Sequence, residues 1–427
     1  MTSKLGNLAF DRWIEGDGDG TVLTSAVNGE PVARITSAGL DFQAVLAHAR
    51  NVGGSNLRKL TFHERGEMLK SLAKHLMEHK DELYELSTDT GATRSDSWID
   101  IDGGISTLFV FSSKGRREMP NDHVFLDGPV EALSGNGTFV GQHICTPKLG
   151  AAIHINAFNF PCWGMLEKLA PALLAGVPAI VKPASSTAYL TELMVHRIQR
   201  SGILPDGALQ LICGGVGDLF DHLNCQDTIA FTGSKSTAEF LQQHPRVVGE
   251  SVAFTAETDS LNSSILGPDA VPGTPEFELY IKEVVNEMTT KTGQKCTAIR
   301  RIIAPAAVAG AVAEALASEL GEVRIGNPAN RDVSMGALAS LGQRDEVRDR
   351  VRELSQQADI VCGGSDDFEL VDADAKKGAF FMPTLLHCEN PLTSTAVHSV
   401  EAFGPVSTIL PYNSLDEAIE LSRMGEG

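Results

Sequence analysis

The sequence lacks the cysteine spacings that are typical of disulfide-stabilised small domains or of structural zinc sites. It has seven cysteines, and no two of them form a C-x-x-C pair. An odd number without paired spacing argues against both a disulfide framework and a zinc ribbon. We therefore expect a protein of the reducing cytoplasm.

Basic charge and long apolar runs are also scarce. The chain carries 35 Lys and Arg residues against 55 Asp and Glu, a formal net charge of −20. Nucleic acids and anionic membranes need a basic surface, so neither is an expected partner. The longest nearly apolar run, residues 169–181, is interrupted by Pro171, Gly176 and Pro178 and is too short to span a bilayer. No apolar signal-peptide core follows the N-terminus.

What remains is the composition of a globular protein. The 427 residues are 42% hydrophobic and 21% charged, which predicts two to three domains. Thr61-x-x-Glu64 is a capping-box pattern that opens a helix, and apolar positions at near-helical spacing continue from it. These positions are Leu69, Leu72, Leu76, Leu83 and Leu86. An Asn136-Gly137 pair between β-prone flanks predicts a hairpin.

Short apolar strands alternate with helical stretches through the middle of the chain. The predicted strands are residues 151–156, 178–182, 208–213 and 228–231, and the predicted helices are 187–200, 216–223 and 236–244. This alternation is typical of a parallel, doubly wound sheet, whose ligand site lies at the carboxyl ends of the strands. A helix over residues 277–288 leads into a second α/β region. The predicted fold class is therefore α/β with two doubly wound domains.

Two motifs have a functional reading that the surrounding sequence does not support. Gly214-Gly215-Val216-Gly217 follows a strand but lacks the full G-x-G-x-x-G spacing, so we interpret it as a tight turn. His75-Leu76-Met77-Glu78-His79 matches H-x-x-E-H, which places two imidazoles one helical turn apart, as zinc hydrolases require. Leu76 lies on the apolar stripe, however, the surroundings are rich in lysine, and no third ligand is evident. We interpret this segment as a charged, solvated helix face and predict no metal ligand.

Four residues carry a more informative combination of chemistry. Asn159 follows a predicted strand and offers an amide donor to an oxyanion, although an Asn before Phe-Pro is also a common turn residue. Glu257 is a carboxylate whose sequence neighbours are largely uncharged, which suits a general base. The alternative is a surface residue at the edge of a strand. Cys296 is a candidate nucleophile near Lys295, Arg300 and Arg301, or an inert thiol. Glu401 is suited to hold a ribose, or ends an element before a turn.

Five motifs in order resemble the aldehyde dehydrogenase superfamily. They are Phe158-Asn159-Phe160-Pro161, Val181-Lys182-Pro183-Ala184, Phe231-Thr232-Gly233-Ser234, Gly293-Gln294-Lys295-Cys296 and Glu401-Ala402-Phe403-Gly404-Pro405-Val406. The resemblance implies that Cys296 is the nucleophile, Asn159 the oxyanion donor and Glu257 the base that activates water. It also implies a nicotinamide cofactor held by Lys182, Ser185, Phe158, Thr232, Gly233, Ser234, Glu401 and Phe403.

The resemblance implies a division of the chain as well. Residues 1–127 and 148–256 would form the cofactor-binding domain, residues 128–147 a bridging and oligomerisation hairpin, and residues 257–427 the domain that bears the nucleophile. Family members continue beyond residue 427, so we expect the last domain to be truncated. A homodimer or higher oligomer is expected if the missing tail is present.

Two residues depart from the family pattern. Ser185 stands where the family usually has a glutamate that holds the adenosine ribose. Without that negative charge a 2′-phosphate is not repelled, which predicts NADP rather than NAD as the cofactor. Ala238 replaces the last glycine of the phosphate-turn motif, where packing against the cofactor is expected to differ.

Longer segments suggest a narrower resemblance. Residues 90–98, 156–171 and 287–301 are similar to the aldehyde dehydrogenase part of the phenylacetate-degradation bifunctional proteins. This similarity implies NADP-dependent oxidation of a CoA-linked aldehyde, 3-oxo-5,6-dehydrosuberyl-CoA semialdehyde, to its acid. The 3,4-dehydroadipyl-CoA semialdehyde of benzoyl-CoA oxidation is the second candidate substrate. A CoA-acylating dehydrogenase, a zinc hydrolase and an inactive or scaffolding fragment remain as alternatives.

Overall fold

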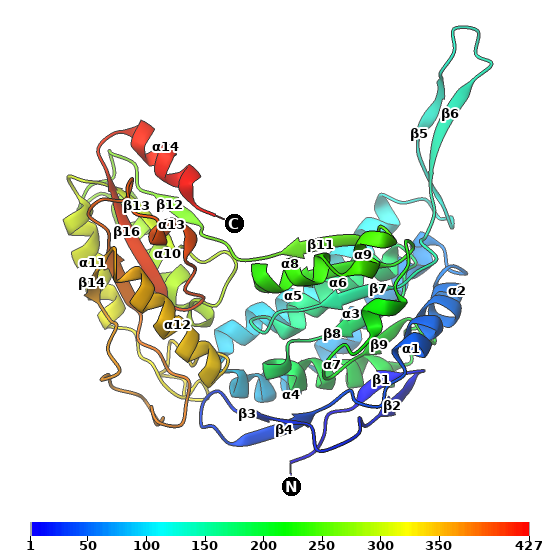
Figure 1. Ribbon diagram of the computed structural model, residues 1–427, viewed down its shortest axis with the longest axis horizontal. Helices are drawn as coiled ribbons and strands as arrows, with labels where there is room; N and C mark the ends of the chain where they lie inside the picture. The colour runs from blue at the N-terminus through cyan, green and yellow to red at the C-terminus, as the bar shows by residue number, and fades with distance from the viewer. Residues whose placement is uncertain (1, 427) are drawn as a thin grey trace. The chain divides into compact units, whose positions relative to one another are not determined.

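The computed structural model describes residues 2–426, which divide into two compact units (Figure 1). Unit 1 contains residues 2–23, 32–85 and 98–257, and unit 2 contains residues 24–31, 86–97 and 258–426. Strands β3 (Thr21–Thr24) and β4 (Pro31–Ile35) pair with each other where the chain passes between the units. Among residues 2–426, no helix combines the length and the apolar composition needed to cross a membrane.

Unit 1 is built on a seven-stranded sheet in the order β11-β10-β7-β8-β9-β1-β2. Its strands are β1 (Asn7–Ala9), β2 (Arg12–Ile14), β7 (Ala152–Ile155), β8 (Ala179–Lys182), β9 (Leu209–Leu211), β10 (Thr228–Thr232) and β11 (Ala253–Glu257). The five strands from β11 to β9 are parallel, and β1 and β2 add an antiparallel edge. This arrangement confirms the parallel sheet that the alternating pattern predicts.

Helices cover both faces of this sheet. Wholly or mostly in unit 1 are α1 (Phe42–His48), η1 (Ala49–Gly53), α2 (Gly54–Leu57), α3 (Phe62–Glu78), α4 (Lys80–Ser87), α5 (Arg94–Arg117), α6 (Pro161–Leu174), η3 (Ser185–Thr187), α7 (Ala188–Ser201), η4 (Leu219–His222), α8 (Lys235–Gln242) and α9 (Pro245–Gly249). Phe42, Leu46 and Phe220 pack with the sheet residues Ile153 and Ile180 in one core cluster. Helices α3, α6 and α7 pack together and bury leucines such as Leu69 and Leu166.

Two of the predicted helices differ in the structure. The capping box forms, with Thr61 and Glu64 bonded to each other's backbone, but α3 ends at Glu78 instead of continuing through Leu86. His79 has φ −117° and ψ 13°, which breaks the helix before α4 begins. The helix predicted over residues 216–223 is also wrong, because only the short turn η4 forms there. Gly217 has φ 49° in the turn before η4, which the hydrogen bond from the Leu219 N–H to the Val216 carbonyl at 3.0 Å closes.

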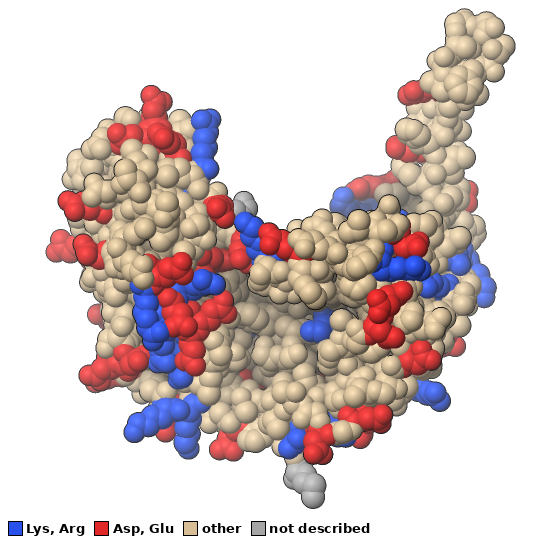
Figure 2. All heavy atoms as spheres, viewed as in Figure 1, with Lys and Arg blue, Asp and Glu red and all other residues tan. Residues whose placement is uncertain are grey.

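A long hairpin formed by β5 (Phe125–Ala132) and β6 (Val140–Cys145) projects from unit 1 (Figure 1). Residues 133–139 connect the strands, which confirms the predicted hairpin, and Gly137 takes φ 67° in this connection. Large apolar side chains such as Leu126, Phe139 and Ile144 are exposed along the hairpin. Figure 2 shows how few charged groups it carries compared with the rest of this face.

Unit 2 has a five-stranded sheet in the order β12-β13-β16-β15-β14, in which only β14 is antiparallel to its neighbour. Its elements are η2 (Thr88–Thr90), β12 (Ser263–Ile265), α10 (Pro275–Thr289), η5 (Thr290–Gly293), β13 (Arg301–Pro305), α11 (Ala309–Gly321), α12 (Leu341–Leu354), β14 (Asp359–Cys362), β15 (Thr384–His387), α13 (Ala396–Ser399), β16 (Val406–Tyr412) and α14 (Leu415–Met424). Helices α10 and α11 supply one core, and α12, α13 and α14 supply another. The second α/β region is therefore confirmed.

A buried histidine in the middle of unit 1 predicts acid sensitivity. His154 lies in β7, and burial, with a smaller contribution from the Lys168 charge, lowers its pKa to about 3. The unfolded chain takes up this proton below pH 6.5, whereas the folded chain does so only near pH 3. The stability from the neutral ring is therefore complete above pH 6.5 and falls by about 1.4 kcal/mol per pH unit below it.

Urea unfolding at several pH values between about 4 and 7 measures this effect. We expect His154→Leu to flatten the fall in unfolding free energy, and the exposed control His123→Gln to keep it. The same slope in wild type and His154→Leu would contradict the assignment.

Candidate active site

The residues predicted in unit 1 gather at the carboxyl ends of four neighbouring parallel strands. Asn159 follows β7, Lys182 ends β8, Thr232 ends β10 and Glu257 ends β11. The register pairs Ile155 with Lys182 and Thr232 with Glu257, so these strand ends are level. Since adjacent strands are about 4.8 Å apart, the four ends span about 14 Å. The structure therefore collects these residues at the edge where doubly wound sheets bind ligands.

Asn159 lies in a turn that buried contacts hold in place. The residue is 8% exposed, and the turn joins β7 to α6. The carboxylate of Asp100 accepts hydrogen bonds from the backbone N–H groups of Cys162 at 3.0 Å and Trp163 at 2.8 Å, at the start of α6. The Thr187 hydroxyl donates to the Phe158 carbonyl at 3.2 Å. Asp100 is a supporting residue that the sequence reasoning missed, because it lies 59 positions away on α5 with no local motif.

At the end of β8, Lys182 provides a positive charge, and Ser185, three residues later, is uncharged. Burial lowers the pKa of the Lys182 ammonium, and no acidic partner of that ammonium is found among residues 2–426. Ser185 is exposed at the start of η3. Neither residue places a carboxylate at this point of the chain. A phosphate group is therefore compatible with this strand end.

The turn after β10 leads directly into a helix N-terminus. Ser234 caps α8 by accepting a hydrogen bond from the Thr237 N–H at 3.4 Å, and the Thr232 hydroxyl is buried without a partner among the described residues. Gly233 donates its N–H to the Glu257 carbonyl at 3.1 Å, and a Cβ there would lie 2.7 Å from the Phe231 ring. Ala238 is buried on α8, so its methyl group belongs to the core. A helix N-terminus of this kind favours anions.

Glu257 is exposed at the end of the edge strand β11. Its neighbours Thr255 and Ala256 are also exposed, and no cation lies within ion-pairing distance of its carboxylate in residues 2–426. The carboxylate is thus accessible to solvent, as a base that activates water must be.

In unit 2, Cys296 is exposed and lies on a strained but firmly held loop. Lys291 and Thr292, in the turn η5, take the left-handed conformation, with φ 53° and 54°. The Lys291 N–H donates to Asp96 at 2.7 Å, and the Ala339 N–H donates to the Gln294 side chain at 2.9 Å. Strain that tertiary contacts maintain is typical of functional loops.

Further contacts fix the backbone of the cysteine itself. The Ser260 hydroxyl at 2.7 Å and the Asn262 amide at 2.6 Å both donate to the Cys296 carbonyl. A Cβ on Gly293 would collide with the Gly404 carbonyl, so the loop packs closely on the segment that follows Glu401. These supporting residues were missed because they are distant in sequence and polar contacts of this kind leave no spacing pattern.

Arg300 is the cation that connects the cysteine loop with Glu401. Its side chain is 4% exposed, and the guanidinium donates to the carbonyls of Gly293 at 2.8 Å and Gly404 at 2.6 Å and to the Glu401 carboxylate at 3.3 Å. It also lies over the Phe403 ring, 5.5 Å from the centroid. Burial lowers the pKa of Arg300, whereas the charges of Glu401, Glu287 and Cys296 raise it.

The other two basic residues proposed near the thiol have different partners. Lys295 pairs with Glu287 at 2.7 Å, and Arg301 donates to the carbonyls of Leu261 at 2.8 Å and Leu421 at 2.7 Å. Arg300, in contrast, donates to the carbonyls of the cysteine loop itself, at Gly293 and Lys295.

Glu401 is nearly buried, and both of its oxygens are positioned. Oε1 accepts from Arg300 and Oε2 from the Ser260 N–H at 3.2 Å. Burial raises the pKa of Glu401, and the Arg300 charge opposes this effect. Each carboxylate oxygen has a second lone pair, so a hydroxyl group can still bind to it. The structure thus groups Cys296, Arg300, Glu401 and Phe403 within unit 2.

Comparison with known proteins identifies this combination. The model of the aldehyde dehydrogenase family matches residues 13–423. The chain belongs to the aldehyde dehydrogenase family. A 3,4-dehydroadipyl-CoA semialdehyde dehydrogenase of Aromatoleum evansii is 46% identical over 425 residues, which cover 99% of this chain and 82% of the relative. An α-ketoglutaric semialdehyde dehydrogenase of Bacillus subtilis (strain 168) is 26% identical over 380 residues, covering 88% and 73%.

Solved aldehyde dehydrogenase structures have the same fold. A betaine aldehyde dehydrogenase of Staphylococcus aureus in complex with NAD+ superposes with a TM-score of 0.85 at 23% identity, covering 98% of this chain and 80% of that one. A 3,6-anhydro-L-galactose dehydrogenase in complex with NADP also gives 0.85 at 23% identity, covering 98% and 84%. The predicted superfamily and fold are therefore confirmed, and the protein is an aldehyde-oxidising oxidoreductase.

Proposed function

We propose that this aldehyde dehydrogenase oxidises a CoA-linked semialdehyde to its carboxylic acid, with NADP as the cofactor. The observation that carries the reaction is the exposed Cys296 thiol on a loop fixed by Ser260, Asn262 and Arg300. The substrate class rests on the 46% identical relative, whose name specifies a CoA semialdehyde. That relative favours 3,4-dehydroadipyl-CoA semialdehyde over the 3-oxo-5,6-dehydrosuberyl-CoA semialdehyde that the sequence motifs ranked first.

The chain's own residues account for both halves of the reaction. The Cys296 thiolate adds to the aldehyde carbon, and the resulting oxyanion accepts hydrogen bonds from the Asn159 amide and the Cys296 N–H. Loss of hydride from that carbon leaves a thioester on Cys296. Glu257 then takes a proton from water, the hydroxide adds to the thioester carbon, and the carboxylic acid leaves as the thiolate is restored.

The residues at the strand ends fit a phosphorylated nicotinamide cofactor. Lys182 and Ser185 would hold the adenosine ribose and its 2′-phosphate, because a positive charge is present there and no carboxylate is. Residues 232–234 and the N-terminus of α8 would hold the pyrophosphate. Phe158, Glu401 and Phe403 would contact the nicotinamide end. When bound, NADP supplies the hydride acceptor of the oxidation.

A direct test offers 3,4-dehydroadipyl-CoA semialdehyde to the full chain and follows NADPH by its near-ultraviolet absorbance. We expect turnover in wild type and none in Cys296→Ala. Product analysis with and without free CoA separates the proposed hydrolytic reaction, which yields an acid, from an acylating one, which yields a CoA thioester. A chain that binds no nucleotide would favour the scaffolding alternative.

The cofactor assignment predicts the effect of a single charge. Ser185→Glu places a carboxylate near the expected 2′-phosphate, so we expect kcat/KM for NADP to fall about 10-fold or more, which corresponds to about 1.4 kcal/mol. Activity with NAD, which lacks that phosphate, is expected to fall less or to rise. Steady-state kinetics with both cofactors measures the change, with Ser71→Glu on the exposed face of α3 as the control. Equal losses with NADP and NAD would exclude this role for Ser185.

We also infer that the β5–β6 hairpin contacts a second copy of the chain. Its exposed Leu126, Phe139 and Ile144 form apolar surface that a monomer leaves in water. This supports the homo-oligomer expected from the family resemblance. Sedimentation of the wild type and of a Phe139→Glu variant would test the contact.

A further inference from the structure

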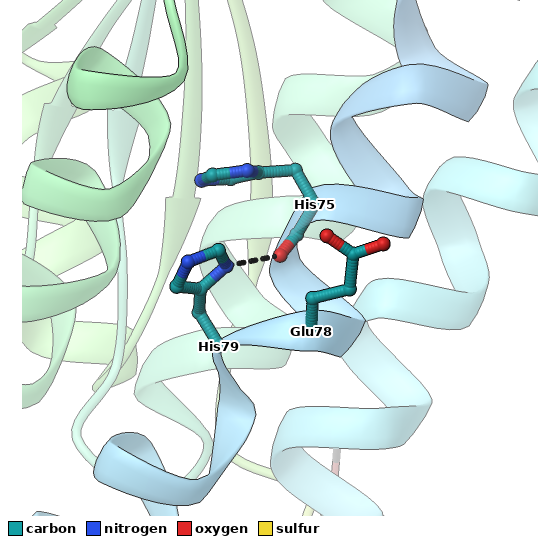
Figure 3. Close-up of side chains that lie close together, drawn as sticks. All are labelled: His75, Glu78 and His79. Atoms are coloured by element: carbon teal, nitrogen blue, oxygen red, sulfur yellow. Dashed lines mark hydrogen bonds between the residues drawn. The ribbon is translucent and has the colours of Figure 1, made fainter.

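The H-x-x-E-H segment, interpreted from its sequence as a helix face without a metal ligand, brings three possible metal ligands together in the structure. His75 is on the last turn of α3, Glu78 ends that helix and His79 follows it (Figure 3). One ligand atom from each residue lies within 4.8 Å of the other two. The rings of His75 and His79 are 4.3 Å apart between centroids. The two imidazoles are half-buried, Glu78 is exposed, and the Glu78 carboxylate is a third possible ligand beside them.

Backbone carbonyls fix the tautomer of both rings. His75 Nε2 lies 3.1 Å from the Arg197 carbonyl, and His79 Nδ1 lies 2.8 Å from the His75 carbonyl. A carbonyl only accepts hydrogen bonds, so the nitrogen that faces it carries the proton. In the neutral rings, His75 Nδ1 and His79 Nε2 therefore keep their lone pairs. Histidines that bind metals are typically anchored in this way through the second nitrogen.

The charges around the cluster permit a cation. Glu78 is exposed and has no ion-pair partner within residues 2–426. Two of the neighbouring cations are paired with carboxylates: Arg197 pairs with Glu82 on α4, and Lys80, which follows His79, pairs with Asp102 at 2.5 Å. The break at His79 matters as well, because it lets the His79 ring turn back toward the last turn of α3.

We propose that His75, Glu78 and His79 form a binding site for a divalent transition metal of the Zn²⁺ class. Two imidazoles and one carboxylate are ligands that zinc prefers. Zinc bonds of about 2.0–2.2 Å bring tetrahedral ligand atoms to about 3.4 Å from each other, so atoms that now lie within 4.8 Å of one another would approach by up to about 1.4 Å on binding. Water completes the coordination.

The site is separate from the proposed catalytic residues of unit 1. Helix α7 begins just after Ser185, and Arg197 lies nine residues beyond its first residue, Ala188. At 1.5 Å per residue this places the Arg197 carbonyl about 14 Å along the helix from the strand ends that carry those residues. The bound metal therefore serves to hold His79, the residue between α3 and α4, against the last turn of α3 and has no part in the oxidation.

Titration of the metal-free full chain with Zn²⁺ tests the proposal, with bound metal measured after dialysis. We expect one strongly bound Zn²⁺ per chain in wild type, at least about 10-fold weaker binding in Glu78→Gln and His79→Gln, and no change in His63→Gln. His63 is a matched control, because it lies on α3 and its Nε2 faces the Met119 carbonyl at 3.0 Å. Since Glu78 is exposed, its variant is not expected to unfold.

The free thiols require a second measurement. With Co²⁺ in place of Zn²⁺, the proposed ligands give weak visible bands without the intense near-ultraviolet band of cobalt–thiolate bonds. A thiolate band, binding that survives in a His75→Gln/His79→Gln double variant, or an absence of binding below millimolar Zn²⁺ would each overturn the proposal.

Discussion

Replacing Glu257 by glutamine is expected to leave the first turnover intact while lowering the steady rate of NADPH formation about 100-fold or more. The proposed mechanism uses the Glu257 carboxylate only after the hydride has left, when water must attack the Cys296 thioester. Glutamine has nearly the same size but cannot accept the proton from water. Rapid mixing with NADP and aldehyde should therefore give a burst of about one NADPH per active chain, followed by a slow phase.

Three comparisons make this experiment decisive. Cys296→Ala should abolish the burst, and the exposed control Glu15→Gln should behave like wild type. Free CoA, added to Glu257→Gln, supplies a thiol that can attack the thioester directly. Because this attack needs no base to activate water, CoA should speed the slow phase. Equal loss of the burst and the steady rate would contradict the role assigned to Glu257.

The strand ends of unit 1 could be predicted from the sequence because their signals are local. A run of apolar residues followed by Asn159, Lys182 or Thr232 contains both the strand and the turn that ends it. Parallel pairing then brings these positions to one edge, as the register of Ile155 with Lys182 demonstrates. The same logic places Glu257 beside Thr232.

The limits of sequence reasoning appear where one residue changes the course of the chain. Leu83 keeps the helical spacing of Leu76, so periodicity alone cannot detect the break that His79 introduces between them. Thr292 is β-branched and disfavours a positive φ, yet the contacts of η5 hold it at 54°. Tertiary contacts override local preference at both places.

The partners of charged residues were equally inaccessible from the sequence. In the sequence, three basic residues near Cys296 look equivalent: Lys295, Arg300 and Arg301. Only the folded chain shows that Lys295 pairs with Glu287 and that Arg301 donates to backbone carbonyls. Arg300 is then the cation shared by the cysteine loop and Glu401, a pairing over 101 positions. The Glu401 carboxylate is thereby held in place before any ribose binds.

Asn159 is the second residue for which a large effect is expected. The Asn159→Ala variant removes one of the two proposed donors to the oxyanion, and the loss of such a donor costs about 2.7–4 kcal/mol at the barrier. We expect the NADPH burst to slow about 100- to 1000-fold, because the donor acts in the step that forms the Cys296 adduct. Stopped-flow measurement of the burst rate tests this directly.

The surroundings of Asn159 allow a structural effect to be separated from a chemical one. Asp100 and Thr187 hold the turn through hydrogen bonds to backbone groups of Cys162, Trp163 and Phe158. These hydrogen bonds do not involve the Asn159 side chain, so they remain available in Asn159→Ala. Asn159→Asp keeps the side-chain size but offers no N–H and adds a negative charge beside the oxyanion, so its burst should be slower still. Unchanged thermal unfolding and NADP binding, together with wild-type kinetics in a control Asn136→Ala at the tip of the hairpin, would place the defect in the chemical step. A burst rate within about threefold of wild type in Asn159→Ala would refute the oxyanion role, since a donor at that position is expected to contribute far more.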